Sequence, residues 1–500
     1  MKEYLWAFAV AALGLVGTAA QDAGEDWISL FDGESLQGWV QRGGEANFAV
    51  EDGAIVGTTV PKTPNSFLCT ERDYGDFVLE LEFLVDPHLN SGVQFRSQSL
   101  PDYKEGRVHG YQCEIDPSDR GWTAGIYEES RRGWLHDLHG NLAARYAFRQ
   151  KEWNHLKIEA IGNRLRTWIN GVPAADLEDG ETAKGFIALQ VHGVGDKEEK
   201  MEVRWRNIRL REDPEPSPEP SPEGNAAPDF SEGPIFPEEA EIRKLAGGFK
   251  FTEGPSLGPE GKIYFNDIPN ERTHVYHPDT GKTRVFRAAT GRANGLWWTP
   301  AGAMLACEGG NRRVSRIGAC GHVYVLAHKF GKKRLNSPND LVLDGFGGFF
   351  FTDPHYGRDK EALELDVEAV YYLSRRGKIS QVAADLTKPN GIILSPDQKT
   401  LYVADPGAET IWAYDVTGEG EIANKRKFAG VGSDGMTVDT GGNVYVTWKG
   451  AVIAFAPSGE ELDRLEFPEG PANCLLVGST LYVTARTSFY AVDINAQGLR

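Results

Sequence analysis

Hydrophobic and polar positions in the second half of the chain recur with a fixed phase. Short apolar runs such as Ile263-Tyr264-Phe265 and Val444-Tyr445-Val446 each follow an oxygen-bearing side chain by about ten residues. The repeat length of about 40 to 50 residues is typical of β-propeller blades, which surround a central channel. The six leading residues are Glu253, Asn294, Asn339, Asn390, Asp434 and Asn473. We therefore expect a six-bladed propeller over residues 235–500, with these side chains converging at one mouth of the channel.

The first half of the chain shows a different pattern, in which apolar and polar residues alternate. Residues 77–83 are an example, and a period of two means that one face of a strand is buried and the other is wet. Several such runs, separated by turn residues and without a convincing amphipathic helix, predict a two-sheet sandwich or jelly roll over residues 27–212. The chain as a whole is predicted to be all-β.

Two further segments fall outside these domains. Residues 213–234 begin with a run of Pro, Glu and Ser, which cannot bury a core and favours an extended, semi-rigid linker. Near the start, the apolar stretch Leu5–Ala20 ends in small residues and is followed by polar ones. It is too short to span a bilayer comfortably and has the form of a signal peptide over residues 1–20. We expect an exported protein, periplasmic or secreted, without a membrane span in its mature part.

Charge and cysteine content limit the partners and the chemistry. A net charge of −19 argues against nucleic acid as a partner, because phosphate contacts need a cationic surface. The five cysteines show no CxxC spacing, which disfavours a zinc site and a disulfide scaffold. Cys307 with Cys320, or Cys69 with Cys113, can pair in an oxidising compartment; buried free thiols are the equal alternative.

The six phased residues of the second half offer carboxylate and amide oxygens. Such ligands suit calcium or magnesium and are poor for zinc or copper. Each residue can instead cap a turn, since Asn294 and Asn390 precede Gly, as does Asp434, and these are ordinary turn dipeptides. Glu253 is a poor turn residue, so the set in register favours a cation site.

Polar side chains also gather on single faces of the first domain's predicted strands. The residues concerned are Gln94 with Arg96, Gln112 with Glu114 and Asp116, and Gln190 with His192. If these strands are neighbours, their polar faces form one concave surface suited to a polyhydroxylated ligand. Two carboxylates there can also supply the acid and the base of glycosidic cleavage. The alternative is a solvated sheet face with routine cross-strand charge pairs.

The first domain resembles the secreted bacterial domains described as 3-keto-disaccharide hydrolases, which have a concanavalin-like jelly-roll fold. The matching motifs cover nearly all of residues 27–212 and are Leu30-Phe31-Asp32-Gly33 with Trp39, Asn90-Ser91-Gly92 with Arg96, Gly110-Tyr111, Gly125-Ile126-Tyr127, Asn170-Gly171, residues 189–193 and Arg206-Asn207-Ile208. In the central strand the chain departs from many relatives, because Gln112 precedes Glu114. Its candidate site residues are Arg96, Glu114, Asp116 and His192.

The second domain resembles the senescence marker protein/gluconolactonase family of six-bladed propellers. The matching motifs, in order, are residues 252–255, 292–296, 337–340, 352–354 with Tyr356-Gly357, 389–391 and 433–436. The resemblance implies that Glu253, Asn339, Asn390 and Asp434 bind one divalent cation, usually calcium, with magnesium, manganese or zinc as alternatives. It also implies that Asp434 is a general base. Candidate substrate contacts are Asn294, Arg292, Arg334 and His355, whereas Asp267, Asp353 and Asp405 are interpreted as turn formers.

These observations predict an exported carbohydrate-processing hydrolase that acts on a small sugar substrate. The propeller is expected to open a sugar lactone with the help of a cation that polarises the carbonyl. The jelly roll is expected to bind or cleave a 3-keto-glycoside. Two alternatives remain open at this stage. One is a metal-dependent esterase or organophosphate hydrolase, and the other is a non-catalytic sugar-binding protein with a calcium-stabilised propeller.

Overall fold

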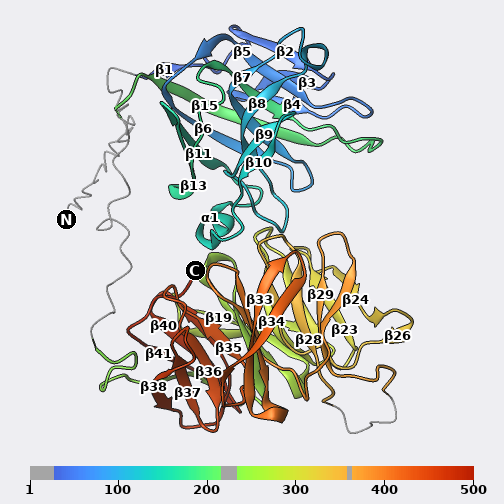
Figure 1. Ribbon diagram of the computed structural model, residues 1–500, viewed down its shortest axis with the longest axis vertical. Coiled ribbons are helices and arrows are strands. Elements are labelled where there is room, and N and C mark those ends of the chain that lie inside the picture. The colour runs from blue at the N-terminus through green and yellow to red at the C-terminus, as the bar shows by residue number, and fades with distance from the viewer. Residues whose placement is uncertain (1–26, 216–232, 357–362) are drawn as a thin grey trace, which may run out of the picture.

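The computed structural model describes residues 27–215, 233–356 and 363–500. The predicted signal peptide and most of the predicted linker lie outside these ranges. Figure 1 shows two bodies of β-structure, with the helix α1 between them. In the described residues, no helix is long and apolar enough to cross a membrane.

The first body is a sandwich of two antiparallel sheets, as the alternating pattern predicts. One sheet has the order β13-β12-β11-β6-β15-β4-β3, with β1 paired to β15, and the other has the order β10-β9-β8-β7-β14-β5-β2. The strands of the first sheet are β1 Ile28–Ser29, β3 Asn47–Glu51, β4 Ala54–Thr58, β6 Phe77–Val85, β11 Asn154–Ile161, β12 Arg164–Ile169, β13 Val172–Glu178 and β15 Glu202–Glu212. Those of the second are β2 Trp39–Gly43, β5 Ser66–Tyr74, β7 Ser91–Gln98, β8 His109–Ile115, β9 Ile126–Glu129, β10 Gly133–His136 and β14 Gly185–Val191.

The core of the sandwich lies between the two sheets and follows the period of two. Tyr111, Cys113 and Ile115 of β8 are buried in it together with Leu79 and Leu81 of β6, so the alternate residues of β8 point to the opposite face. The short helix α1, Leu142–Ala147, was not predicted. Its N-cap is Asn141, whose side chain accepts a hydrogen bond from the backbone N–H of Ala144.

The second body is a propeller of six four-stranded sheets, which confirms the number of blades predicted from the repeat. In chain order the blades are β17 Thr252–Leu257, β18 Ile263–Asp267, β19 Arg272–His277 and β20 Lys282–Ala288; β21 Ala293–Trp298, β22 Met304–Glu308, β23 Arg313–Ile317 and β24 Val323–Ala327; β27 Leu341–Leu343, β28 Phe349–Asp353, β29 Ala369–Leu373 and β30 Ile379–Ala383; β31 Ile392–Leu394, β32 Thr400–Asp405, β33 Thr410–Gly418 and β34 Glu421–Ala429; β35 Met436–Val438, β36 Val444–Trp448, β37 Ala451–Phe455 and β38 Glu461–Glu466; and β39 Pro471–Val477, β40 Thr480–Ala485 and β41 Ser488–Asp493 with β16 Arg243–Gly247. A small hairpin adds β25 Lys329–Phe330 and β26 Lys333–Arg334.

The ring of blades is closed by an early strand that joins a late blade. β16, the first propeller strand in the sequence, pairs with β41, the last one. The apolar runs of the repeat form buried strands such as β28 and β36, whose side chains pack in clusters between neighbouring blades. All five cysteines are free, four of them buried and Cys320 exposed. Of the two possibilities left open by the sequence, the structure therefore has free thiols.

Helix α1 and the loops beside it dock the jelly roll on the propeller. The hydroxyl of Tyr146 donates to the carbonyl oxygen of Trp298 at 2.9 Å and accepts from the Trp297 indole at the same distance. Leu142 of α1 also lines a small cavity that runs along the inner strands of the blades. The jelly roll therefore lies at one end of the channel, and the opposite mouth stays open.

Candidate functional site

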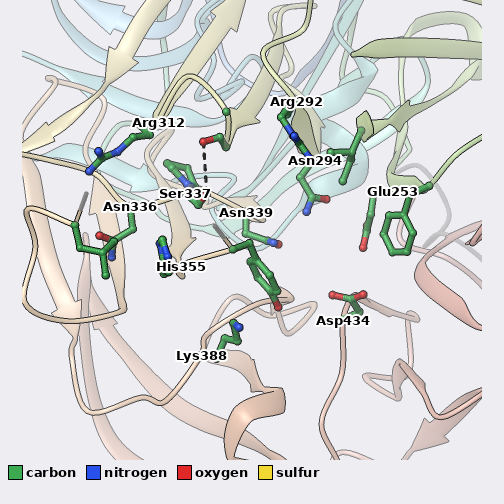
Figure 2. A pocket seen from close by; sticks show the side chains of 17 residues that line it. Glu253, Arg292, Asn294, Arg312, Asn336, Ser337, Asn339, His355, Lys388 and Asp434 are labelled. Carbon is green, nitrogen blue, oxygen red and sulfur yellow. Dashed lines mark hydrogen bonds between the residues drawn. The ribbon is translucent and has the colours of Figure 1, made fainter. Parts of the chain in front are cut away.

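The open mouth of the propeller holds a cavity of about 860 Å³. Its lining includes Glu253, Asn294, Asn339 and Asp434, each at or just before the innermost strand of a different blade. Figure 2 shows the carboxylates of Glu253 and Asp434 pointing toward one another, with both amides beside them. The phase of the repeat therefore brings these four side chains together.

The two carboxylates are like charges, with Glu253 buried and Asp434 half-buried. Glu253 is 2% exposed, and its Oε2 accepts a hydrogen bond of 2.8 Å from the backbone N–H of Gly254. Burial, and next the charge of Asp434, raise the pKa of Glu253 well above its ordinary value. Burial also raises the pKa of Asp434 to about 6, although the hydrogen bond from Asn390 and the charge of Arg486 oppose this. Two carboxyl groups held in this way form a site that a cation stabilises.

Amide side chains lie beside these carboxylates. Asn390 is 1% exposed, and its Nδ2 donates to Asp434 Oδ1 and, at 2.6 Å, to the hydroxyl of Tyr356. The Oδ1 atom of Asn294 is buried and has no hydrogen-bond partner. Within the described ranges, no group of three or more His, Cys, Asp or Glu side chains could hold a metal ion. A cation at the mouth would therefore use amide oxygens as well as the two carboxylates, which is the donor chemistry of calcium.

Three buried aspartates anchor the loops that carry the candidate ligands. Each accepts two hydrogen bonds from backbone amides that lie two or three residues before the ligand of its own blade, at distances of 2.7 to 3.2 Å. The pairs are Asp267 with residues 250–251, Asp353 with residues 336–337, and Asp405 with residues 387–388. The sequence interpretation of these aspartates was that they form turns; their bonds instead reach amides 16 to 18 residues earlier and hold the loops that lead to Glu253, Asn339 and Asn390.

The remaining predicted contacts are divided between the cavity and the surface. Arg292 and His355 line the cavity, and Figure 2 shows both around its rim. Arg334 is not among the lining residues; it lies exposed in β26, where its Nη2 donates to the carbonyl oxygen of Asn311 at 3.4 Å. Asn473, which was expected at the mouth, lines the small cavity along the inner strands instead, next to Gly435.

Several lining residues were not named as site candidates from the sequence. These are Arg312, Asn336, Ser337, Tyr356 and Lys388, among others. Asn336 and Lys388 lie two or three residues before a candidate ligand, so proximity to Asn339 and Asn390 was a usable signal. Arg312 lies in the loop between β22 and β23, and its Nε donates to the carbonyl oxygen of Leu335 at 2.6 Å.

A second cluster lies on the polar face of the jelly roll and centres on Glu114. Asn90 Nδ2 donates to Glu114 Oε1 at 2.7 Å, and Gln112 Nε2 donates to Oε2 at 2.8 Å. Gln112 Oε1 in turn accepts from Gln94 at 2.5 Å and from Gln190 at 3.0 Å. Strands β7, β8 and β14 are neighbours, so the predicted merging of their polar faces is observed for these amides.

The charges around Glu114 are unequal. Burial, followed by the charge of Asp116, raises the pKa of Glu114 to about 7. Burial also acts on Asp116, but the charge of Arg120 and hydrogen bonds from Ser118 and Arg120 hold the pKa of Asp116 below its ordinary value. Arg120 Nε lies 2.7 Å from Asp116 Oδ2. The two carboxyl groups therefore differ: one is matched to proton transfer near neutral pH, and the other is the partner of an arginine.

Two other jelly-roll candidates do not join this cluster, and the expectation of a shared face is corrected for them. Arg96 has a positive φ of 44° at an irregularity of β7, which breaks the alternation and turns its side chain away. Its guanidinium is 1% exposed and donates to the carbonyl oxygens of Gly75 and Gly162 and to Asp76. His192 lies exposed just beyond β14, with Nδ1 2.8 Å from the carbonyl oxygen of Gly193.

Residues 26–211 match the family model described as a 3-keto-alpha-glucoside-1,2-lyase-like domain. This match agrees with the resemblance stated from the motifs of the jelly roll. The description names a lyase, whereas the sequence motifs suggested hydrolases.

Residues 251–487 match the family model described as the SMP-30/gluconolactonase/LRE-like region. The chain is 30% identical over 281 residues to a gluconolactonase of Zymomonas mobilis, covering 49% of this chain and 78% of that protein. It is 26% identical over 260 residues to a pentonolactonase of Haloferax volcanii, covering 47% of this chain and 81% of that protein. An X-ray structure of a candidate gluconolactonase is 33% identical, with a TM-score of 0.51, and covers 55% of this chain and 98% of that one. Through its propeller, the chain belongs to the SMP-30/gluconolactonase/LRE-like family.

Proposed function

We propose that the propeller hydrolyses a sugar lactone with a divalent cation, calcium, bound at its mouth. The observation that carries this proposal is the convergence of Glu253 and Asp434 in the oxygen-lined cavity at the propeller mouth. Glu253, Asn339, Asn390 and Asp434 would hold the cation. The names of the related gluconolactonase and pentonolactonase support a sugar lactone as substrate.

The residues of the mouth have distinct tasks in this reaction. The bound cation would supply a Lewis acid that polarises the lactone carbonyl. Asp434 takes a proton from the attacking water and returns one to the ring oxygen as the ester bond opens. Asn294 and Arg292, which line the same cavity, orient the hydroxyl groups of the sugar.

The test is hydrolysis of a panel of aldonolactones by the full chain, with and without calcium, beside Asp434→Asn. We expect turnover that requires added calcium, and a loss of about 10³-fold or more in the variant, since it lacks both a ligand charge and the base. Asp279→Asn is the matched control, because Asp279 is exposed and lies outside the cavity lining. Tight calcium binding without opening of any lactone would contradict the proposal.

For the jelly roll we propose cleavage of a 3-keto-glycoside by elimination. The specific observation is that Glu114 alone is matched to proton transfer, because Asp116 is held as the partner of Arg120. Glu114 takes the proton from the carbon beside the ketone, a C=C bond forms to the anomeric carbon, and the glycosidic C–O bond breaks. The departing oxygen then takes a proton from water. The description of the matching family model as a lyase supports this route.

Mass spectrometry of the products distinguishes elimination from hydrolysis. With 4-nitrophenyl 3-keto-α-glucoside as the probe, we expect release of nitrophenol and an unsaturated keto-sugar. That sugar is lighter by one water than the hydrolysis product. Glu114→Gln removes the base and is expected to abolish release. A keto-sugar that carries oxygen from labelled water at its anomeric carbon from the earliest time points would instead indicate hydrolysis.

We further propose that the protein is exported, on the basis of the apolar segment Leu5–Ala20. N-terminal sequencing of the protein recovered outside the cytoplasm is expected to begin at or near Gln21. An intact N-terminus on protein that stays with the cytoplasmic fraction would contradict export.

A further inference from the structure

Arg120 belongs to the loop that joins β8 to β9 and turns back toward Glu114. Its Nη2 lies 3.9 Å from Glu114 Oε1, and its Nε lies 2.7 Å from Asp116 Oδ2. The guanidinium also lies over the rings of Trp122 and Trp134, at 4.3 and 4.9 Å from their centroids. The position of this guanidinium therefore depends on how the loop is held.

The propeller holds the loop through two hydrogen-bonded links. The indole N–H of Trp122 donates to the carbonyl oxygen of Gly345 at 3.0 Å. Arg145 of α1 donates through Nε to the carbonyl oxygen of Arg120 at 3.0 Å and through Nη2 to that of Asp344 at 2.7 Å. Arg145 is fully buried, so its hydrogen bonds are shielded from water and are not readily replaced by bonds to solvent.

An ion pair and close packing hold the same loop. Arg316 of β23 lies 3.1 Å from Asp119 through its Nε. A Cβ atom placed on Gly347 would lie 3.1 Å from Arg120 Cα, and one on Gly121 would lie 2.8 Å from Pro300 Cβ. Four successive loop residues, 119–122, thus contact the propeller directly or through Arg145.

We propose that the propeller is a working part of the jelly-roll site, because it holds residues 119–122 and thereby fixes Arg120 against Glu114 and Asp116. Arg120 is a positioning residue: it keeps Asp116 paired and leaves Glu114 as the single base. Gly345, Asp344 and Arg316 of the propeller act on the jelly-roll reaction through it. The reaction itself rests on the function proposed above for the jelly roll.

The proton affinity of Glu114 is the property that this arrangement sets. The charged or titratable groups that face Glu114 are Asp116 at the end of its own strand, Arg120 from the loop and Tyr127 from β9. The charge of Arg120 lowers the pKa of Glu114, which burial and Asp116 raise to about 7. If the loop loosens and Arg120 moves away, the pKa of Glu114 rises and the base is available only at higher pH.

The experiment uses the full chain with Trp122→Phe and Arg316→Ala, singly and together. Trp122→Phe keeps an aromatic ring under Arg120 but removes the N–H bonded to Gly345, and Arg316 lies in a different domain from Glu114. We expect the pH midpoint of kcat/KM for 4-nitrophenyl 3-keto-α-glucoside to rise by about half a unit in each single variant and further in the double variant. The lactonase activity of the same molecules stays unchanged and shows that they are folded.

A second readout does not depend on turnover. The infrared band of the protonated Glu114 carboxyl, identified by its loss in Glu114→Gln, titrates with the pKa of Glu114 itself. It should move upward by the same amount in Trp122→Phe and Arg316→Ala. The matched control is Arg164→Ala, which removes an ion pair with Asp176 on the other sheet of the sandwich, between β12 and β13. It should move neither readout.

The outcomes separate the two claims. If the wild type does not cleave the keto-glucoside, the proposed jelly-roll reaction is wrong, and the infrared titration alone decides whether the propeller positions Arg120. If the Glu114 band titrates at the same pH in the wild type and in the double variant, the positioning inference is overturned, whether or not cleavage occurs.

Discussion

The two clusters of carboxyl groups in this chain are balanced in different ways. On the jelly-roll face, Glu114 receives hydrogen bonds from Asn90 and Gln112 and lies beside the guanidinium of Arg120. At the propeller mouth, neither Glu253 nor Asp434 forms an ion pair within the described part of the chain. The jelly-roll cluster therefore contains a positive side chain beside its carboxyl groups, whereas the propeller cluster brings two like charges together.

This difference explains how similar residue types can serve unlike chemistry. A buried carboxyl group with amides and an arginine beside it has a pKa near neutrality, and it can act as a base without a bound cation. Two converging carboxyl groups are costly to ionise together unless a cation joins them. The comparison therefore predicts that the two activities respond to different treatments within one molecule.

Removal of divalent cations should produce the largest separation between the two sites. In a chelating buffer we expect lactone hydrolysis by the full chain to fall about 10⁴-fold, since a Lewis acid contributes several kcal/mol to such a reaction. Keto-glucoside cleavage by the same sample should stay within about twofold, because its base is balanced by Arg120. Parallel assays before and after addition of calcium check this. Equal loss of both activities would break the comparison.

The reciprocal change is Glu114→Gln, which should lower keto-glucoside cleavage by about 10³-fold and leave lactone hydrolysis unaffected. Glutamine keeps the shape and the bond from Asn90 but cannot take a proton. The control is Glu80→Gln in β6, on the other sheet of the sandwich, where Glu80 pairs with Arg209 of β15 at 2.6 Å. Residual cleavage at the wild-type rate would mean that another group is the base.

The same substitution also tests the electrostatics through stability. The pKa of Glu114 is raised in the folded chain to about 7 from 4.5, so the folded state prefers the protonated carboxyl. The associated stability is present below about pH 4.5 and is lost as the pH rises through about 7. We expect Glu114→Gln to gain about 3 kcal/mol relative to the wild type over this interval. Denaturant unfolding of both proteins at several pH values measures it, and a constant difference would contradict the burial of an ionisable Glu114.

The parts that the sequence predicted are those with a period. The repeat phase located the blades and brought four of the six phased residues into the lining of the mouth cavity, whereas Asn473 lines the small cavity along the inner strands. The alternation of β8 likewise placed Gln112 and Glu114 on one face. Arg96 broke this rule, since one positive φ reverses the direction of a side chain and nothing in the spacing of polar residues signals it.

Contacts between distant segments left no periodic trace. Trp122 and Gly345 are 223 residues apart in the sequence, and the short helix α1 that supplies Arg145 interrupts a β-rich segment. Such contacts depend on how two finished domains dock, which neither the strand pattern nor the turn signals describe. The anchoring aspartates are an intermediate case: their place after a blade strand was visible, but the loop that each one holds was not.

Asp353→Asn should have the smallest effect and tests whether the mouth depends on its anchored loops. Asp353 accepts the backbone N–H groups of Asn336 and Ser337, both at 2.7 Å, and burial raises its pKa to about 7. Asparagine can accept only one of these bonds, because its NH₂ group faces the other donor. We expect calcium affinity and kcat/KM for lactones to fall about tenfold through misplacement of Asn339, the usual size of effect for a group that orients a ligand. Calorimetric calcium titration checks this, with Asp279→Asn as the control. An unchanged affinity would mean that the position of Asn339 is fixed by its blade alone. The propeller mouth would then not depend on its anchored loops, in contrast to the jelly-roll face, whose Arg120 we propose is held by the other domain.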